Sequence, residues 1–458
     1  MPQQNATLKH ETTQESGLRH QLSAGQMAMV AVGGSIGTGL LLGSAAAIEI
    51  AGPAVILSYV LAGFICWTVT MAVGELSSAH PGAGSFGLYA DLYLNPWAGF
   101  VSRTGYWIAI SVSVGASLVA SATYMHYWFP TVPALVWIGL FSLVLIVINL
   151  RPVGDYGRFE YWLAMVKLVT MAVFIFIGGM LLISGRVPAQ YTSHGGFFPR
   201  GTLAPLLAMT FALYTFGGIE IVAITTGESR TTAEIPRAVK WTFTMLAVVY
   251  LGAIVVLVGV MPWNRAGVTE SPFVSVFRTV GIPAATSLMS FVILTAALSG
   301  ANANLYSASR MLFSLARRGW APASLGKLNA AGSPKLALIA SSYGIAVAVV
   351  LETWAPRNAF VYILTGALFG LMLSWLVSLA AHVSFRKRMS RAQVAALPMR
   401  SPLGAWGSML GLTLVNAAIL KTWWDSRVSL LSGLSTILLL TAAYLLLKAS
   451  KKTSLVNQ

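Results

Sequence analysis

The sequence predicts an all-α polytopic membrane protein with twelve transmembrane helices. Of its 458 residues, 56% are hydrophobic and only 9% are charged, whereas about 25% of the residues in soluble domains carry a charge. Apolar segments close to the roughly 20 residues that a spanning helix needs recur along the whole chain. Two of these segments are interrupted by glycines at corresponding places, a pattern typical of secondary transporters.

The apolar segments give the order of the expected helices. We expect helices at residues 26–51, 53–78, 96–129, 132–150, 157–184, 202–227, 237–262, 282–315, 336–353, 359–384, 404–422 and 429–448. Polar tails are expected at residues 1–25 and 451–458. The remaining polar stretches contain no zinc-ligand spacing, phosphate loop or catalytic triad, so we expect no enzymatic activity, no cofactor and no metal.

Most of the 29 Lys and Arg residues lie in the loops on one side of this arrangement, and the formal net charge is +16. Loops rich in Lys and Arg remain in the cytoplasm, so both termini are expected to be cytoplasmic. The basic residues are spread over short loops and form no single basic face, so nucleic-acid binding is not expected. The expected location is the cell membrane, with the lipid bilayer as a partner.

The first apolar segment is interrupted at residues 31–42, which read AVGGSIGTGLLL. Glycine is a poor helix former, and Ser and Thr compete for backbone hydrogen bonds. Inside a membrane, a broken helix is tolerated only where the freed backbone groups face protein or a watery cavity. Freed N–H groups suit a carboxylate, and freed carbonyl groups suit an amine. We therefore expect half of a binding site for a small zwitterion here.

The sixth segment is interrupted by Gly217 and Gly218, which precede Glu220. Small residues alone also permit close helix packing, but two interruptions five segments apart favour broken helices. Because a block of five helices ends on the opposite side from its start, residues 26–200 and 201–400 are expected to form a 5+5 inverted repeat with broken helices 1 and 6. Residues 401–450 are expected to add two further helices.

Four motifs lie in order along the chain: GGSIGTG at 33–39, GE at 74–75 with PGAGSF at 81–86, FGGIEIVAITTGESRTTAEIPRAVK at 216–240, and LYSASRMLFSLA at 305–316. At these motifs the sequence resembles the amino acid–polyamine–organocation superfamily. Within it, the resemblance is to the bacterial amino acid permeases that include lysine, aromatic amino acid and gamma-aminobutyrate carriers. The resemblance implies a leucine-transporter-like fold of ten core helices plus two, and import of an amino acid with a proton.

The resemblance also implies a set of substrate-binding residues at the two interruptions. The substrate carboxylate is expected at the N–H groups of Ser35, Ile36, Gly37, Thr38 and Gly39. Its ammonium is expected at the carbonyls of Ala31, Val32 and Gly33, and further contacts are expected from Tyr214, Thr215, Phe216 and Gly218. Phe216 is in addition a candidate aromatic gate, and ordinary packing is the alternative for this side chain.

Lys167 lies in the middle of its apolar segment. A lysine at the centre of a bilayer costs about 2.5–3.5 kcal/mol on insertion scales, so it is a functional candidate by default. The resemblance places its ammonium where a metal ion joins the first and eighth helices of sodium-coupled relatives. Protonated Lys167 is expected to hold the carbonyls of the first interruption and deprotonated Lys167 to release them, which makes it the proton-coupling candidate. A permanently charged structural tether is the alternative.

Six further acidic or basic residues are expected to contribute. Glu220 is expected to cap free N–H groups, to take up the coupled proton, or to contact a substrate amine. Glu75 is a candidate inner gate with Arg310 as its partner, and a solvated carboxylate at a helix end is the alternative. Asp91, Arg103 and Glu228 are weaker gate candidates.

Ser117 occupies a place where many relatives have a glutamate. A pocket without that carboxylate is poorly suited to a second positive charge, so a neutral amino acid is the expected substrate. An exchanger, or a carrier of gamma-aminobutyrate or an amine, is the alternative of the same fold. An ion channel built on broken helices and a membrane enzyme are alternatives of other classes.

Overall fold

The computed structural model describes residues 18–41, 43–82, 84–265, 273–274, 276, 283–354, 359–425 and 427–456. Within these ranges the regular structure is helical, apart from an isolated bridge between Leu22 and Ser229. Each of the twelve expected apolar segments coincides with a helix or a group of consecutive helices. The all-helical prediction is therefore confirmed.

The first half of the chain forms the helices that carry the first interruption and the lipid-facing helix α9. They are α2 (Ala24–Ser35), α3 (Thr38–Leu41), α4 (Gly43–Ala51), α5 (Val55–Ala79), α6 (Ser85–Tyr93), α7 (Pro96–Trp128), α8 (Ala134–Asn149) and α9 (Val153–Ile183). A capping box starts α2, in which the Ser23 N–H donates to Gln26 Oε1 at 3.0 Å and the Gln26 N–H donates to Ser23 Oγ at 3.3 Å.

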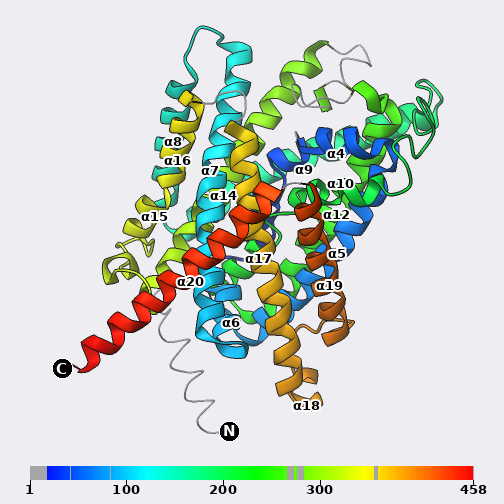
Figure 1. Cartoon of the computed structure of the whole chain (residues 1–458). Coiled ribbons are helices and arrows are strands. Elements are labelled where there is room, and N and C mark those ends of the chain that lie inside the picture. The colour runs from blue at the N-terminus through cyan, green and yellow to red at the C-terminus, as the bar shows by residue number, and fades with distance from the viewer. Residues whose placement is uncertain are drawn as a thin grey trace.

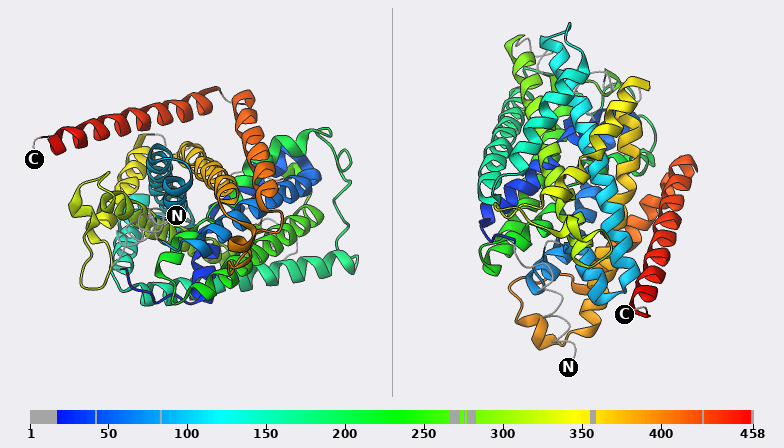
Figure 2. Two further views of the ribbon diagram at one scale, coloured as in Figure 1. Left: turned by 90° about the horizontal axis from the view of Figure 1, so that it is seen from below. Right: turned by 90° about the vertical axis from the view of Figure 1, so that its left-hand side faces the viewer.

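The second half carries the second interruption and the peripheral helices. They are α10 (Ala204–Thr215), α11 (Ile221–Thr225), α12 (Ile235–Val260), α14 (Pro283–Arg317), α15 (Lys335–Ser341), α16 (Tyr343–Trp354), α17 (Ala359–Arg388), α18 (Arg391–Ala395), α19 (Gly404–Asp425) and α20 (Arg427–Val456). The long helices α7 and α14 pack along each other at the centre of the bundle (Figure 1). Helices α19 and α20 lie at its outer edge (Figure 2).

Six described helical segments are long and apolar enough to cross a membrane. They are Gly43–Ala79, Pro96–Trp128, Val153–Ile183, Thr232–Val260, Phe369–Arg388 and Gly433–Ser450. On α9 large apolar side chains are exposed along one face, including Trp162 and Phe176, each with 68% of its surface accessible. Such a face is stable only against lipid or another apolar surface, which fits a protein built for the bilayer.

Both segments expected to be interrupted are interrupted, but the first interruption is shorter than predicted. Helix α2 continues through Gly33 and Gly34 to Ser35, and α3 begins at Thr38. The two glycines remain helical because tertiary contacts favour them: a side chain at Gly33 would meet Glu160, and one at Gly34 would meet Ile221. The second interruption runs from Phe216 to Glu220, and Gly218 has the positive φ of +100° that L-residues rarely adopt.

Candidate functional site

A cavity of about 60 Å³ lies between the two interruptions. Main-chain and side-chain atoms from five parts of the chain line it: Gly34, Ser35, Gly37 and Gly39; Ile110, Ser113 and Ser117 of α7; Tyr214, Gly217, Gly218 and Glu220; Gly300 and Asn304 of α14; and Leu371 of α17. The lining is largely glycine and serine, so little side chain separates the main chain from the cavity. Such a cavity suits a small polar molecule.

The two interruptions touch each other at this cavity. A Cβ atom on Gly218 would lie 2.8 Å from the main chain of Gly34 and Ser35, so the two backbones approach to a distance that only glycine allows. On the other side, Thr215 Oγ1 donates to the carbonyl of Gly39 at 3.2 Å and lies 3.0 Å from Tyr59 Oη. The broken ends of the two helices are therefore held as one unit.

Several main-chain groups assigned to the substrate are used within the protein. The Ile36 N–H donates to Val32 O at 2.8 Å, and the Gly37 N–H donates to Ser35 O at 2.9 Å. The carbonyl of Gly33 accepts from Lys167. These four groups therefore already have hydrogen-bond partners within the protein, and their contact with the substrate stays a prediction. The helix extends further toward the cavity than glycine content alone indicates.

The Ser35 hydroxyl is buried against the cavity and has no hydrogen-bond partner among the described residues. A buried hydroxyl without a partner costs free energy. A polar ligand in the cavity would supply the missing hydrogen bond.

Six of the predicted substrate-binding residues line the cavity, namely Ser35, Gly37, Gly39, Ser117, Tyr214 and Gly218. The lining does not include Ala31, Val32, Gly33, Ile36, Thr215 or Phe216. The side chain of Thr38 lies outside the part of the chain that the structure describes. Sequence reasoning missed Ile110, Asn304 and Leu371, because ordinary helix residues carry no signal of the cavity that they face.

Phe216, a candidate aromatic gate with ordinary packing as the alternative, is packed among other aromatic side chains. Its side chain is fully buried, with ring centroids 4.8 Å from Tyr250 and 6.5 Å from Tyr59. The turn at the end of α10 directs it toward α5 and α12, away from the cavity. The aromatic side chain that does line the cavity is Tyr214.

Lys167 lies on α9 and is fully buried. Its Nζ donates to the carbonyl of Gly33 at 2.6 Å and to that of Ile36 at 3.0 Å. Both carbonyls lie at the C-terminal end of α2. The last carbonyls of a helix lack intrahelical donors, and the helix dipole is negative there, so both features favour a bound ammonium. The ammonium therefore ties α9 to the first interruption.

Glu160 is a buried carboxylate that sequence reasoning missed. It accepts hydrogen bonds from the Ser299 hydroxyl and, at 2.7 Å, from Asn302 Nδ2. A Cβ on Gly33 would lie 2.1 Å from Glu160 Oε1, so the carboxylate packs directly against α2. A spacing of seven residues from Lys167, two helical turns, is the sequence signal that places both groups on one face of α9.

Glu220 makes no side-chain hydrogen bond to the first turn of α11, so it does not cap that half-helix as expected, and it binds a main-chain N–H within the interruption instead. Its two carboxylate oxygens accept from the Gly218 N–H, each at 3.2 Å. Tyr106 Oη donates to the same carboxylate at 2.8 Å, and Trp375 Nε1 donates at 3.1 Å. The second interruption is thus fixed to α7 and α17 through one acidic side chain.

The predicted pair of Glu75 and Arg310 does not form. Glu75 accepts from Arg386 at 2.6 Å and from the Ser401 N–H at 2.6 Å, and lies 3.3 Å from His382. Helix rotation, which sequence does not give, turns Glu75 of α5 toward α17.

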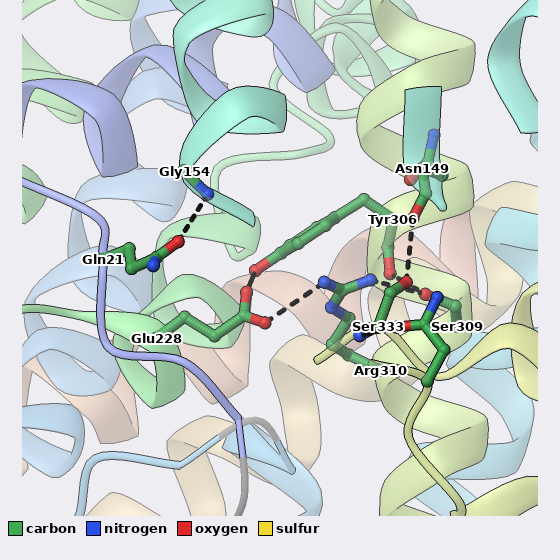
Figure 3. Close-up of polar contacts among 9 residues, drawn as sticks. Gln21, Asn149, Gly154, Glu228, Tyr306, Ser309, Arg310 and Ser333 are labelled. Atoms are coloured by element: carbon green, nitrogen blue, oxygen red, sulfur yellow. Dashed lines mark hydrogen bonds and ion pairs between the residues drawn. The ribbon is translucent and has the colours of Figure 1, made fainter. Parts of the chain in front are cut away.

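Arg310 binds a different carboxylate, that of Glu228, at 3.1 Å (Figure 3). Tyr306 Oη donates to the same carboxylate, and the Arg310 guanidinium lies 4.0 Å from the Tyr306 ring centroid. A second buried pair joins Arg103 to Asp91 at 2.6 Å. The weaker gate candidates Asp91, Arg103 and Glu228 are therefore all in ion pairs.

Comparison with known proteins decides the family. A sequence model described as amino acid permease matches residues 26–449. The chain belongs to the amino acid permease family. This permease is accordingly a multi-pass membrane transport protein of that family and not an enzyme.

Curated relatives span nearly the full length of the permease. A probable threonine/serine transporter of Bacillus subtilis (strain 168) is 34% identical, over 95% of this chain and 96% of the relative. The gamma-aminobutyric acid permease of the same organism is 35% identical, with 84% of each chain covered. The aromatic amino acid transport protein AroP of Escherichia coli (strain K12) is 35% identical, over 88% of this chain and 90% of the relative.

Proposed function

We propose that this permease imports a neutral amino acid together with a proton, by alternating access across the cell membrane. The observation that carries the proposal is the fully buried ammonium of Lys167, bound to two carbonyls at the end of α2 beside the cavity. An ionisable group inside a membrane segment marks an ion pathway by default. Loss of its proton would release the carbonyls and so link protonation to the shape of the first interruption.

The proposed architecture allows protonation of Lys167 to control access to the cavity. It has twelve crossings, with both termini in the cytoplasm, residues 26–200 and 201–400 as inverted repeats and residues 401–450 as two added helices. The cavity then lies at the contact between the interruptions of the two repeats. Movement of one repeat against the other exposes the cavity to each side in turn.

A neutral substrate fits the charges at the cavity. The carboxylate in the lining, that of Glu220, already accepts from Gly218, Tyr106 and Trp375. Ser117 lines the cavity at the place where a glutamate would attract a cationic side chain. The substrate ammonium and carboxylate would therefore bind the Ser35 hydroxyl, which has no partner among the described residues, and the main chain that lines the cavity at Gly34, Gly37 and Gly39.

Protonation of His80 is not expected to replace that of Lys167 in this role. His80 follows the end of α5 and lies 2.5 Å from Tyr93 Oη. Burial lowers the pKa of His80 to about 4, so its imidazole is uncharged at neutral pH.

Uptake into proteoliposomes tests the proposal directly. A pH gradient with the acidic side outside is expected to drive accumulation of a labelled neutral amino acid. Competition by each of the common amino acids would identify which substrate side chain the permease accepts. The relative named as a gamma-aminobutyric acid permease supports one other candidate, a carrier of that compound or an amine. Uptake that requires substrate on the opposite side and ignores the pH gradient would contradict symport and favour exchange.

Replacing Gly300 by alanine is expected to change substrate size selection without harming the fold. Gly300 lines the cavity from α14, and a Cβ there would meet no atom within 4 Å. The helix should gain up to about 1 kcal/mol from the substitution. Because a methyl group would occupy part of the cavity, KM for bulky amino acids should rise about tenfold while glycine and alanine are affected less.

The matched control is Gly139→Ala. Gly139 lies in α8, away from the cavity, and a Cβ there also meets no atom within 4 Å. Both variants should gain thermal stability in detergent, and only Gly300→Ala should alter the ratio of KM values for large and small substrates. An unchanged ratio would show that the side chain of the substrate lies elsewhere.

A further inference from the structure

The buried face of α9 carries three groups that can accept or donate a proton. Its buried residues recur at intervals of three and four, as one face of a helix requires, and include Tyr156, Glu160 and Lys167. From Tyr156 to Lys167 is about 16 Å along the axis, at 1.5 Å per residue. The opposite face of α9 carries exposed Trp162 and Phe176, so the three groups are separated from it by the helix itself.

Glu160 stands in the middle of this face and is fully buried. Its hydrogen bonds come from Ser299 and Asn302 of α14, and Asn302 Oδ1 in turn accepts from Asn149 Nδ2 at 2.7 Å. These donors are uncharged. The nearest cationic group on its own helix face is Lys167, which is bound to the carbonyls of α2 and makes no direct ion pair with Glu160. If Lys167 loses its proton while Glu160 stays ionised, a buried negative charge remains without compensation, which is costly.

Tyr156 lies one turn beyond Glu160, toward the start of α9, where positions i and i+4 are neighbours. Its hydroxyl is buried and has no hydrogen-bond partner among the described residues. Its ring stacks on Tyr306, with centroids 4.6 Å apart and an interplanar angle of 9°. Tyr306 Oη reaches Glu228, which also binds Arg310 (Figure 3). The titratable face of α9 thus ends at a second buried carboxylate.

We infer that Glu160 is a second proton-binding site of this permease, which takes the proton from Lys167 and passes it along Tyr156 toward Glu228. The inference rests on the proposed proton coupling at Lys167. In the first step the Lys167 ammonium and the Glu160 carboxylate become an amine and a carboxylic acid, directly as the lysine swings off the carbonyls or through one water. Total charge is unchanged, so no isolated charge is created in the bilayer.

In the second step Lys167 takes up a new proton, and the Glu160 acid is ionised again beside the restored ammonium. Because the Tyr156 hydroxyl makes no hydrogen bond to either carboxylate, the proton moves through water to the Tyr156 oxygen, and the tyrosine releases its own proton through water to the Glu228 carboxylate. The charged and titratable groups that face this end of the path are Tyr306, Arg310 and Glu228. The proton then leaves Glu228 at the inner end of the bundle.

The test measures proton movement and substrate movement separately, in proteoliposomes that contain a pH-sensitive dye. Glu160→Gln keeps the size of the side chain and an oxygen that can accept from α14. Exchange of labelled against unlabelled amino acid should stay within about twofold of wild type, since the cavity lining is untouched. Substrate-driven proton flux should fall about 100-fold, the contribution expected of one positioned proton-transfer group.

Asp155→Asn is the matched control, because Asp155 is on the same helix but its side chain is 59% exposed and lies 4.0 Å from Arg158, which is 78% exposed. It should leave both measurements unchanged. Wild-type proton flux in Glu160→Gln would overturn the inference, and so would a parallel loss of exchange and proton flux, which indicates a structural role. Absence of substrate-driven proton flux in the wild type would instead contradict the proposed function itself.

Tyr156→Phe decides the matter if Glu160→Gln does not fold. It removes a hydroxyl that has no partner among the described residues and keeps the ring that stacks on Tyr306. Proton flux should fall about tenfold, less than for Glu160, because water can replace a hydroxyl. Wild-type flux in this variant would exclude the path along α9.

Discussion

Accumulation driven by a pH gradient should be lost when Lys167 is replaced by alanine, while some binding and exchange of the amino acid remain. The ammonium makes two hydrogen bonds, to the carbonyls of Gly33 and Ile36, at 2.6 and 3.0 Å. Hydrogen bonds to a charged group contribute about 1.5–3 kcal/mol each, so gradient-driven accumulation should fall at least about 100-fold. The alanine side chain has no group that can be protonated and cannot donate to the carbonyls of Gly33 and Ile36. Substrate binding is therefore no longer linked to protonation at this position.

The measurement is uptake into proteoliposomes with and without an imposed pH gradient, beside counterflow of labelled substrate. Lys240→Ala is the control, because Lys240 is an exposed lysine of α12 and its removal should change neither assay. Proton-driven accumulation at the wild-type level in Lys167→Ala would remove the coupling role. A protein that is merely destabilised would lose counterflow as well.

Gly218→Ala should abolish substrate binding. Gly218 has φ of +100°, and a Cβ there would lie 2.8 Å from the main chain of Gly34 and Ser35. The two interruptions must then move apart by several tenths of an ångström or more, and misplacement of binding groups by about 1 Å can cost about 100-fold. Apparent affinity for the amino acid, measured by the shift in melting temperature on binding, should fall accordingly.

A matched control separates backbone strain from the contact between the interruptions. Gly201 also has a positive φ, of +91°, but a Cβ there meets no atom within 4 Å. Gly201→Ala should cost about 1–3 kcal/mol in stability through strain alone and should retain substrate affinity. Equal loss of affinity in both variants would mean that the approach of Gly218 to α2 is not required for binding.

The positions of the helices could be predicted from the sequence because spanning segments need a minimum apolar length. The glycines at 33–39 and 217–218 also indicated where the helices break, although α2 runs on to Ser35. Helix propensity disfavours Gly33 and Gly34 in a helix. Their close contacts with Glu160 and Ile221 outweigh that preference, and such contacts are not visible in the sequence.

The partners of the buried charges could not be predicted in the same way. Which face of α5 meets α17 depends on helix rotation, so the pairing of Glu75 with Arg386 was missed. Glu160 was overlooked for a different reason. The expected segment began at residue 157, which puts this carboxylate near the membrane boundary, whereas α9 begins at Val153 and Glu160 lies about two turns inside the helix.

The short bridge between residues 18–23 and the loop after α11 has a mechanical consequence. The N–H groups of Gln21 and Leu22 donate to Glu228 O at 3.0 and 2.9 Å, and the Arg230 N–H donates back to Leu22 O at 2.9 Å. Residues 18–23 lead directly into α2, and residues 228–230 follow α11. The hydrogen bonds therefore connect the start of α2 to the end of α11. If α2 moves while these three hydrogen bonds stay intact, α11 must move with it. The two helices would then shift as one rigid element.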